Sequence, residues 1–300
     1  WDEFLKIGKE EFEKNKDFPN FCIDEIKSDD VALMIYTSGT TGPPKASMLS
    51  HGNMEWTASI IPDLSFTPNI SNPEYLSYLP LCHVFGRLVD EIIAINSIGT
   101  INFAESIDTV QRDLAEIQPS IFPAVPRILE RMHAGTLVRM KDASKLKQIL
   151  FQLASFFGNI TAKRRLKNPN DIIAKISNFI SQIISFISLR NKLGLLNVDN
   201  AVSGAAPISP EILRFFMSLG VPIYEGYGMT ENSAVATGNT PDKVKLGTVG
   251  TAQPGVEIKL ADDGEILVRH PGVFLGYYKN EEATNEVLDE DGWLYTGDVG

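Results

Sequence analysis

The sequence predicts an α/β protein, a layered αβ sandwich of mostly parallel sheets with helices, followed by a smaller β-rich subdomain near the C-terminus. Between residues 31 and 246, short apolar runs alternate with segments of helical length, which is the pattern of βα units. From residue 247 the elements become shorter and β-rich. The 300 residues are 43% apolar and 22% charged, which excludes a disordered or fibrous chain.

Each expected element follows from local pattern. Residues 1–30 are expected to form a polar helix and a linker. The continuously apolar run at 31–36 is typical of a buried strand. The other expected strands are 74–80, 100–104, 120–125, 200–203 and 221–224, and the expected helices are 51–64, 84–98, 108–118, 127 onward and 210–219. Alternating residues around Asp262-Asp263-Gly264 predict a hairpin of 256–260 with 265–269. We therefore divide the chain into a central α/β part, 1–246, and a β-rich subdomain, 247–300.

Residues 139–192 interrupt the α/β rhythm with a basic helical insert. This segment has eleven Lys and Arg against two Asp, a net charge of +9, while the whole chain carries −11. Apolar residues, mostly isoleucine, recur between 172 and 187 at helical spacing, and serines dominate the opposite side. Two alternatives remain open. The stripe packs against the sheet or another helix, as most amphipathic helices do, or it contacts an anionic membrane beside Lys163, Arg164, Arg165 and Lys167.

Charge and cysteine content restrict the functional classes. The net charge of −11 argues against duplex DNA, so we expect no nucleic-acid partner. Cys22 and Cys82 cannot form a disulfide framework, which favours a reducing, cytoplasmic location. If the basic insert contacts a membrane, we expect the protein at its inner face. We expect Cys82 to be a small buried hydrophobe. The histidines show no zinc-ligand spacing. The chain starts at Trp1 and stops abruptly, and we interpret it as part of a longer protein; the sequence indicates no oligomeric state.

A loop rich in glycine and hydroxyls follows the first strand and ends at a lysine. Its candidate anion-binding residues are Thr37, Ser38, Gly39, Thr40, Thr41, Gly42 and Lys45. Glycines let the backbone approach an anion, hydroxyls donate to phosphate oxygens, and lysine adds a charge. A solvated turn is the alternative. A Walker A loop is disfavoured because Lys45 follows Pro44 and precedes Ala46.

Three motifs in order give the chain a recognisable family character. Residues 36–45, Gly226-Tyr227-Gly228-Met229-Thr230-Glu231 and Tyr295-Thr296-Gly297-Asp298 resemble the phosphate, adenine and ribose motifs of the acyl-adenylate-forming (AMP-binding) superfamily. Residues 79–85, 125–130 and 203–207 are similar to its long-chain fatty acid:CoA ligases. The resemblance implies the core of a large N-terminal domain, ending near the hinge to a small C-terminal domain.

The resemblance also implies a two-step reaction. A fatty acid carboxylate attacks the α-phosphorus of ATP, giving acyl-AMP and pyrophosphate, and coenzyme A then displaces AMP. ATP, Mg²⁺ and coenzyme A are the implied cofactors and co-substrates. The alternatives are activation of another carboxylic acid, including transfer to a carrier protein, and a nucleotide-binding or membrane-docking module without catalysis.

The resemblance assigns roles residue by residue. Thr37 and Glu231 would hold Mg²⁺ and its phosphates, Thr230 would donate to the α-phosphate, and Lys45 is expected to orient the β- and γ-phosphates.

Further roles follow in the same way. Tyr227 would stack on adenine, with Gly226 and Gly228 allowing close approach, and Asp298 would accept both ribose hydroxyls. Gly204, Ala205 and Ala206 would form the wall between nucleotide and acyl chain. His83 would stand where the acyl pocket meets the thiol tunnel. Arg87 occupies the position of a gating Trp found in some bacterial relatives, so we assume no such gate.

Overall fold

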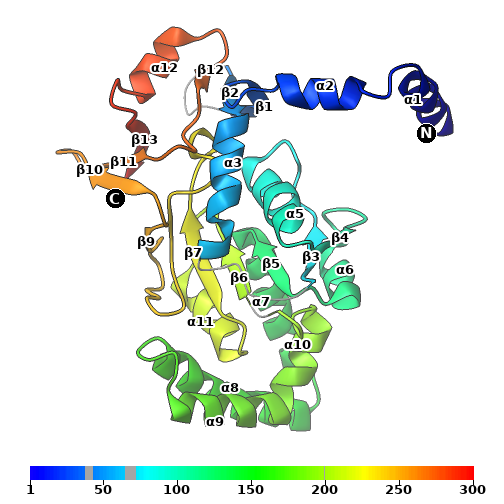
Figure 1. The fold of residues 1–300 in the computed structure, drawn as a ribbon. Helices are drawn as coiled ribbons and strands as arrows, with labels where there is room; N and C mark the ends of the chain where they lie inside the picture. The colour runs from blue at the N-terminus through cyan, green and yellow to red at the C-terminus, as the bar shows by residue number, and fades with distance from the viewer. Residues whose placement is uncertain (38–42, 65–71, 199) are drawn as a thin grey trace.

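The computed structural model describes residues 1–37, 43–64, 72–198 and 200–300. Within these residues, a seven-stranded sheet forms the centre, in the order β4-β3-β5-β6-β7-β8-β9 (Figure 1). Its strands are β3 (Glu74–Ser77), β4 (Thr100–Phe103), β5 (Ile121–Ala124), β6 (Asn200–Ser203), β7 (Ile223–Tyr227), β8 (Thr237–Gly238) and β9 (Thr251–Ala252). The pairings from β4 to β7 are parallel, and β8 and β9 are antiparallel. The expected mostly parallel α/β architecture is thereby confirmed.

Helices cover both faces of this sheet. They are α3 (His51–Ile60) with η1 (Ile61–Asp63), the continuous helix α4 (Val84–Gly86), η2 (Arg87–Ile93) and α5 (Ala94–Asn96), then α6 (Val110–Ile117), α7 (Pro126–Lys141) and α11 (Pro210–Ser218). Consecutive strand residues point to opposite faces. Phe122 of β5 accordingly packs in the core shared with α6, α7 and α11, whereas its neighbour Ile121 packs in the core shared with α3 and η2.

Two smaller antiparallel sheets complete the described chain. One joins β1 (Val31–Thr37), β2 (Lys45–Ser50) and β12 (Gly276–Tyr277). The other joins β10 (Glu257–Leu260), β11 (Glu265–Arg269) and β13 (Leu294–Val299), and α12 (Glu281–Val287) lies between β12 and β13 in sequence. The predicted hairpin is confirmed by the pairing of Leu260 with Ile266. Strands after residue 247 are shared among three sheets, and the division at 246 stays a prediction.

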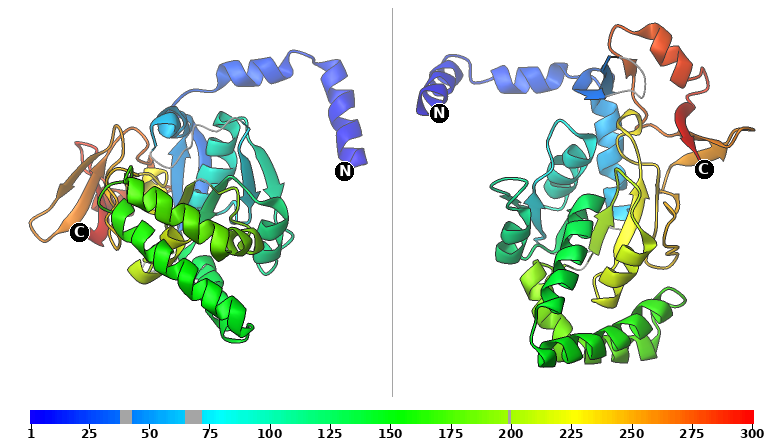
Figure 2. Two further views of the ribbon diagram at one scale, coloured as in Figure 1. Left: turned by 90° about the horizontal axis from the view of Figure 1, so that it is seen from below. Right: turned by 180° about the vertical axis from the view of Figure 1, so that it is seen from behind.

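The expectation of a buried strand at 31–36 is wrong. Ile35 is 4% exposed, but Tyr36 is 69% exposed and Val31 and Met34 are also exposed. The reason is position, because β1 is an edge strand that pairs only with β2 instead of lying inside the parallel sheet. Helices α1 (Asp2–Lys14) and α2 (Phe18–Glu25) extend away from the body as an exposed arm, so the expected linker is partly helical (Figures 1 and 2).

The basic insert is helical, as expected. It consists of α8 (Lys145–Arg165), followed by a nearly continuous helix made of α9 (Ile172–Ser181), η3 (Gln182–Phe186) and α10 (Ile187–Leu193). Figure 2, left, looks onto α8 and α9 from below and shows them nearest the viewer, outside the central sheet. The insert therefore forms one end of the molecule.

Candidate active site

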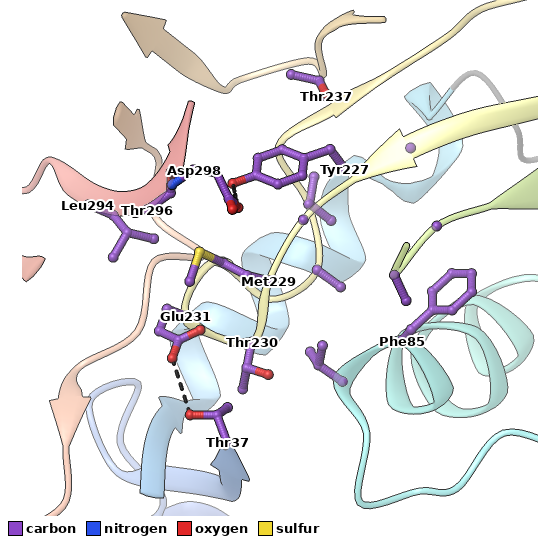
Figure 3. Close-up of a pocket in the computed structure, with 18 of the residues that line it drawn as sticks. Thr37, Phe85, Tyr227, Met229, Thr230, Glu231, Thr237, Leu294, Thr296 and Asp298 are labelled. Atoms are coloured by element: carbon purple, nitrogen blue, oxygen red, sulfur yellow. Dashed lines mark hydrogen bonds between the residues drawn. The ribbon is translucent and has the colours of Figure 1, made fainter. Parts of the chain in front are cut away.

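A pocket of about 590 Å³ opens beyond the carboxyl ends of β6 and β7, the usual place for a ligand in a parallel α/β sheet (Figure 3). Among the described residues, the sequence-predicted ones that line it are Thr37, Lys45, His83, Gly204, Ala205, Gly226, Tyr227, Gly228, Thr230, Glu231 and Asp298. Ala206 does not line it. Ser38, Gly39, Thr40, Thr41 and Gly42 lie outside the described residues. Residues from both ends of the sequence thus meet in one cavity.

Glu231 is the buried carboxylate of this pocket. It lies in the 3-10 turn η4 (Thr230–Asn232), two residues after β7 ends. The residue is only 4% exposed. Its Oε1 accepts hydrogen bonds from the hydroxyls of Tyr277 (2.9 Å), Ser47 (3.2 Å) and Thr37 (3.5 Å). Three different strands, β12, β2 and β1, therefore hold one carboxylate oxygen in place.

Lys45 brings a positive charge to the same end of the pocket. It begins β2, where its Cα is the register partner of Thr37. Its Nζ lies 5.0 Å from the centre of the Tyr277 ring, within the range of a cation–π interaction. Tyr277 thus contacts both charged groups, Lys45 through its ring and Glu231 through its hydroxyl.

The oxygen donors of this pocket suit a hard divalent cation only when a bound phosphate group adds further oxygens. A carboxylate and a hydroxyl, Glu231 and Thr37, are oxygen donors of the kind Mg²⁺ prefers. Buried carboxylates require compensation, and no ion pair to Glu231 is found in the described part of the chain. The same residues contain no group of three or more His, Cys, Asp or Glu able to hold a metal alone. Phosphate oxygens would have to complete the coordination.

Tyr227 and Asp298 close the opposite side of the pocket. The Tyr227 hydroxyl donates to Asp298 Oδ2 at 2.6 Å (Figure 3). Burial, followed by the Asp298 carboxylate, raises the pKa of Tyr227, so this hydroxyl remains a donor. Asp298 itself is exposed. Its carboxylate offers further acceptor capacity.

Backbone geometry requires one of the glycines, Gly228, and strains Ala205. A Cβ on Gly228 would overlap the backbone carbonyl of Ala234, so this glycine is required by packing of the loop that carries Glu231. A Cβ on Gly226 would meet nothing closer than 3.6 Å. Ala205 has a φ of +69°, a conformation that non-glycine residues adopt at a cost and that is often found at functional sites.

One further wall of the pocket is apolar. It comes from the residue after η1, from α4 and η2, from β6, and from the segment between η4 and β8: Leu64, Val84, Phe85, Leu88, Val202 and Val235. His83 stands at its edge as the N-cap of α4, and its Nδ1 accepts from the Phe85 N–H at 3.1 Å. In a neutral ring Nε2 then carries the proton.

Two further expectations concern residues next to His83. Cys82 is exposed, so the expectation of a buried hydrophobe is wrong, because it lies in the turn before α4. Arg87 donates to the Leu81 carbonyl at 2.6 Å and pairs with Glu91. It is not among the residues that line the pocket.

Sequence reasoning missed two important residues, Ser47 and Tyr277. Both contact Glu231, yet neither belongs to a hydroxyl- or acid-rich motif. Thr237 and Gln253, which also line the pocket, were missed for the same reason. A signal for Tyr277 exists only in three dimensions, in the pairing of β12 with β2.

Comparison with known proteins agrees with this geometry. The family model described as AMP-binding enzyme matches residues 2–278. The peroxisomal long chain acyl-CoA synthetase 6 of Arabidopsis thaliana is 37% identical over 296 residues, covering 91% of this chain and 40% of the relative. The long-chain-fatty-acid–CoA ligase ACSBG2 of Mus musculus is 33% identical over 315 residues, covering 100% of this chain and 46% of the relative. The chain thus spans less than half the length of these relatives.

Solved structures show the same fold. The o-succinylbenzoate CoA synthetase of Bacillus subtilis, in complex with its acyl-adenylate intermediate, superposes with a TM-score of 0.64 at 22% identity, covering 92% of this chain and 47% of that one. The N-terminal domain of FACL13 from Mycobacterium tuberculosis gives 0.64 at 21% identity, covering 92% and 58%. These identities support the fold alone.

Proposed function

Because this chain belongs to the AMP-binding enzyme family, we propose that the protein activates a long-chain fatty acid with ATP and transfers the acyl group from acyl-AMP to coenzyme A. Relatives named as long-chain fatty acid ligases, at 33% and 37% identity, support the acid and the thiol. The carboxylate would attack the α-phosphorus and release pyrophosphate. Coenzyme A would then displace AMP.

One observation carries this proposal, namely that a single pocket combines an anion-handling end with an apolar wall. Lys45, Thr37 and Glu231 gather at one end, and Phe85 and Leu88 lie on the wall. Two anions, a carboxylate and a polyphosphate, must approach each other in the first step. Positioned cations and donors lower that barrier most effectively.

We assign the residues as follows. Lys45 would pair with the β- and γ-phosphates, and Thr230 would donate to the α-phosphate. Mg²⁺, held by Thr37 and Glu231 together with phosphate oxygens, would neutralise phosphate charge when bound. The carboxylate of Glu231 is oriented for this task by the three hydroxyls around it.

Nucleoside recognition falls to the other side of the pocket. Tyr227 would stack on the adenine, and its bond to Asp298 would orient that carboxylate toward the ribose hydroxyls. Gly204 and Ala205 would separate nucleotide from acyl chain. His83 would stand between the acyl pocket and the path of the thiol.

The proposed place of the reaction is the cytoplasm, at the inner face of a membrane. Both cysteines, Cys22 and Cys82, are free and exposed, which fits a reducing compartment. The fatty acid substrate partitions into lipid, so an enzyme at a membrane meets it at higher concentration.

ATP–pyrophosphate exchange with the full protein tests the proposal. A panel of long-chain, short-chain and aromatic acids should give exchange chiefly with long-chain acids. Glu231→Gln should reduce exchange roughly a hundredfold or more, since it removes charge from a metal–phosphate site worth several kcal/mol.

Glu225→Gln is the matched control. Glu225 is also buried, accepts from the Gly247 N–H at 2.9 Å, and does not line the pocket. Near-normal exchange in Glu231→Gln, or an equal loss in Glu225→Gln, contradicts the role of Glu231. Nucleotide binding without exchange for any acid would favour a non-catalytic module, and exchange confined to aromatic acids would overturn the fatty acid assignment.

A further inference from the structure

The helix that starts with α9 turns its apolar side to solvent. The exposed residues, at spacings of three and four, are Ile172, Ile176, Phe179, Ile183 and Ile187, with Ile172 73% and Ile183 66% exposed. Ala174, Ser177 and Ser181, on the opposite side, are buried. Of the two alternatives for this stripe, packing against the sheet or a neighbouring helix therefore does not hold for these five residues.

Small and polar groups hold the helix with its apolar side toward solvent. The Thr161 hydroxyl of α8 donates to the Ala174 carbonyl at 3.3 Å, and Gln182 Nε2 donates to the Leu219 carbonyl beyond α11 at 2.7 Å. Gly158 of α8 lies directly against the Ser218 carbonyl, where no side chain would fit. Within α9 the side that faces the protein thus carries small residues, and large apolar residues of this helix reach the core only further along, at Phe186 and Leu193.

Helix α8 extends the same kind of surface. Its exposed apolar residues also recur at spacings of three and four: Leu146, Ile149, Leu153 and Phe156. Figure 1 shows α8 and α9 packed side by side at the end of the molecule away from α12. We call the exposed residues of 145–192 the outer surface of the α8–α9 pair. Rows of exposed apolar residues on two adjacent helices are the kind of surface that marks an interaction site.

Positive charge accompanies the apolar residues. The exposed lysines of this surface are Lys145, Lys147, Lys163, Lys167, Lys175 and Lys192. Of the basic cluster expected at 163–167, only Lys163 and Lys167 are exposed. Arg164 binds Asp171 at 2.8 Å, and Arg165 is half-buried, which lowers its pKa. With Asp171 neutralised by Arg164, the free charge of this surface is positive.

We propose that the outer surface of the α8–α9 pair docks on an anionic lipid bilayer, with the isoleucines in the headgroup region and the lysines against acidic lipids. A basic helix with one apolar face is the hallmark of interfacial binding. A second copy of the chain is a poorer occupant, because it would bring the same positive charge to the contact. This inference rests on the location proposed above, to which it assigns a surface, and it does not depend on the proposed reaction.

Docking fits the surface better than spanning. Residues Ile172–Leu193 form the one described helix that is long and apolar enough to cross a membrane by length and composition. Two of its serines, Ser177 and Ser181, are however buried against the protein, at 5% and 0% exposed. Only one side of the helix is available to lipid, as in a helix lying along the interface.

Vesicle co-sedimentation of the full protein tests the proposal. Neutral phosphatidylcholine vesicles are compared with vesicles containing about a third phosphatidylserine, at low and high salt. We expect binding to the anionic vesicles that weakens with salt. Lys163→Glu with Lys175→Glu should weaken it at least about fivefold per residue, the fold-change that corresponds to about 1 kcal/mol per basic side chain. Ile176→Ser with Ile183→Ser should also reduce it.

Controls use equally exposed residues far from this surface. Ile95→Ser and Lys279→Glu, on α5 and in the turn before α12, should leave vesicle binding unchanged. Failure of the full protein to bind anionic vesicles at low salt overturns the proposal, as does binding that neither pair of substitutions affects. A dimer that Ile176→Ser with Ile183→Ser dissociates, without vesicle binding, would assign the surface to a second copy. Resistance to extraction by high salt and carbonate would indicate a spanning helix and contradict docking.

Discussion

Tyr277→Phe removes one hydroxyl from the best-connected carboxylate of the pocket. The hydroxyl donates to Glu231 Oε1 at 2.9 Å, the shortest of the three bonds to that oxygen. The phenylalanine ring would keep the position over which Lys45 Nζ lies and the edge contact with Phe274 at 5.0 Å between ring centres. The substitution therefore isolates the hydrogen bond from the packing.

The expected loss can be worked from this geometry. A hydrogen bond to a charged group contributes about 1.5–3 kcal/mol, and a factor of ten corresponds to about 1.4 kcal/mol. If Glu231 must be held in position for ATP and its metal, kcat/KM for ATP should fall about tenfold to a hundredfold. Burial, and then Glu231, raises the pKa of Tyr277 above its ordinary value of 10.0, so the loss should be constant through neutral and mildly alkaline pH.

Pyrophosphate exchange at varied Mg²⁺ concentration is the assay. We expect a higher half-saturating Mg²⁺ concentration in Tyr277→Phe, which a purely structural role of the hydroxyl would not produce. Tyr278→Phe is the matched control, because Tyr278 is the exposed neighbour and does not line the pocket. Exchange within twofold of the parent, or the same loss in Tyr278→Phe, would refute the reasoning.

Lys45→Met should lower ATP use about tenfold or more through loss of a charge-assisted contact; an unchanged KM and kcat for ATP would count against it. Gly228→Ala should destabilise the fold by about 1–3 kcal/mol in thermal or urea unfolding, because its Cβ would overlap Ala234, whereas Gly226→Ala should be tolerated. Burial lowers the pKa of His270 from 6.5 to about 4, so the unfolded chain takes up a proton first as pH falls. The free energy of unfolding should therefore decrease between pH 6.5 and 4 by up to about 3 kcal/mol. An equally steep decrease in a His270→Gln variant would show that His270 is not its cause.

Sequence reasoning predicted residues that line the pocket where the predicted residues are neighbours in the chain. The loop ending at Lys45 and the stretch from Gly226 to Glu231 carry their chemistry in consecutive residues, and those that are described line one pocket. Ser47 and Tyr277 escaped prediction because their contact with Glu231 arises only when β2 pairs with β12. The sequence of neither strand alone predicts that the two strands pair in this register.

The spacing of apolar residues likewise predicts that a helix or strand has an apolar face. It does not predict whether other parts of the protein cover that face. The run at 31–36 was apolar enough for a buried strand, yet it forms an exposed edge. The isoleucines between 172 and 187 mark one side of a helix, and the structure buries the serine side instead. In both segments the decisive fact is the position of the element in the fold, which depends on contacts with distant residues.

The pairing of β2 with β12 also has a consequence for biosynthesis. Ser47 and Tyr277 are separated by roughly 230 residues, so a ribosome adding about 5–20 residues per second needs roughly 12–46 s between them. During that interval β2 offers an unpaired edge to other nascent chains. Slowing translation should therefore increase aggregation of this protein, and supplying a holdase chaperone should reduce it, even though β2 is paired on both edges in the finished fold.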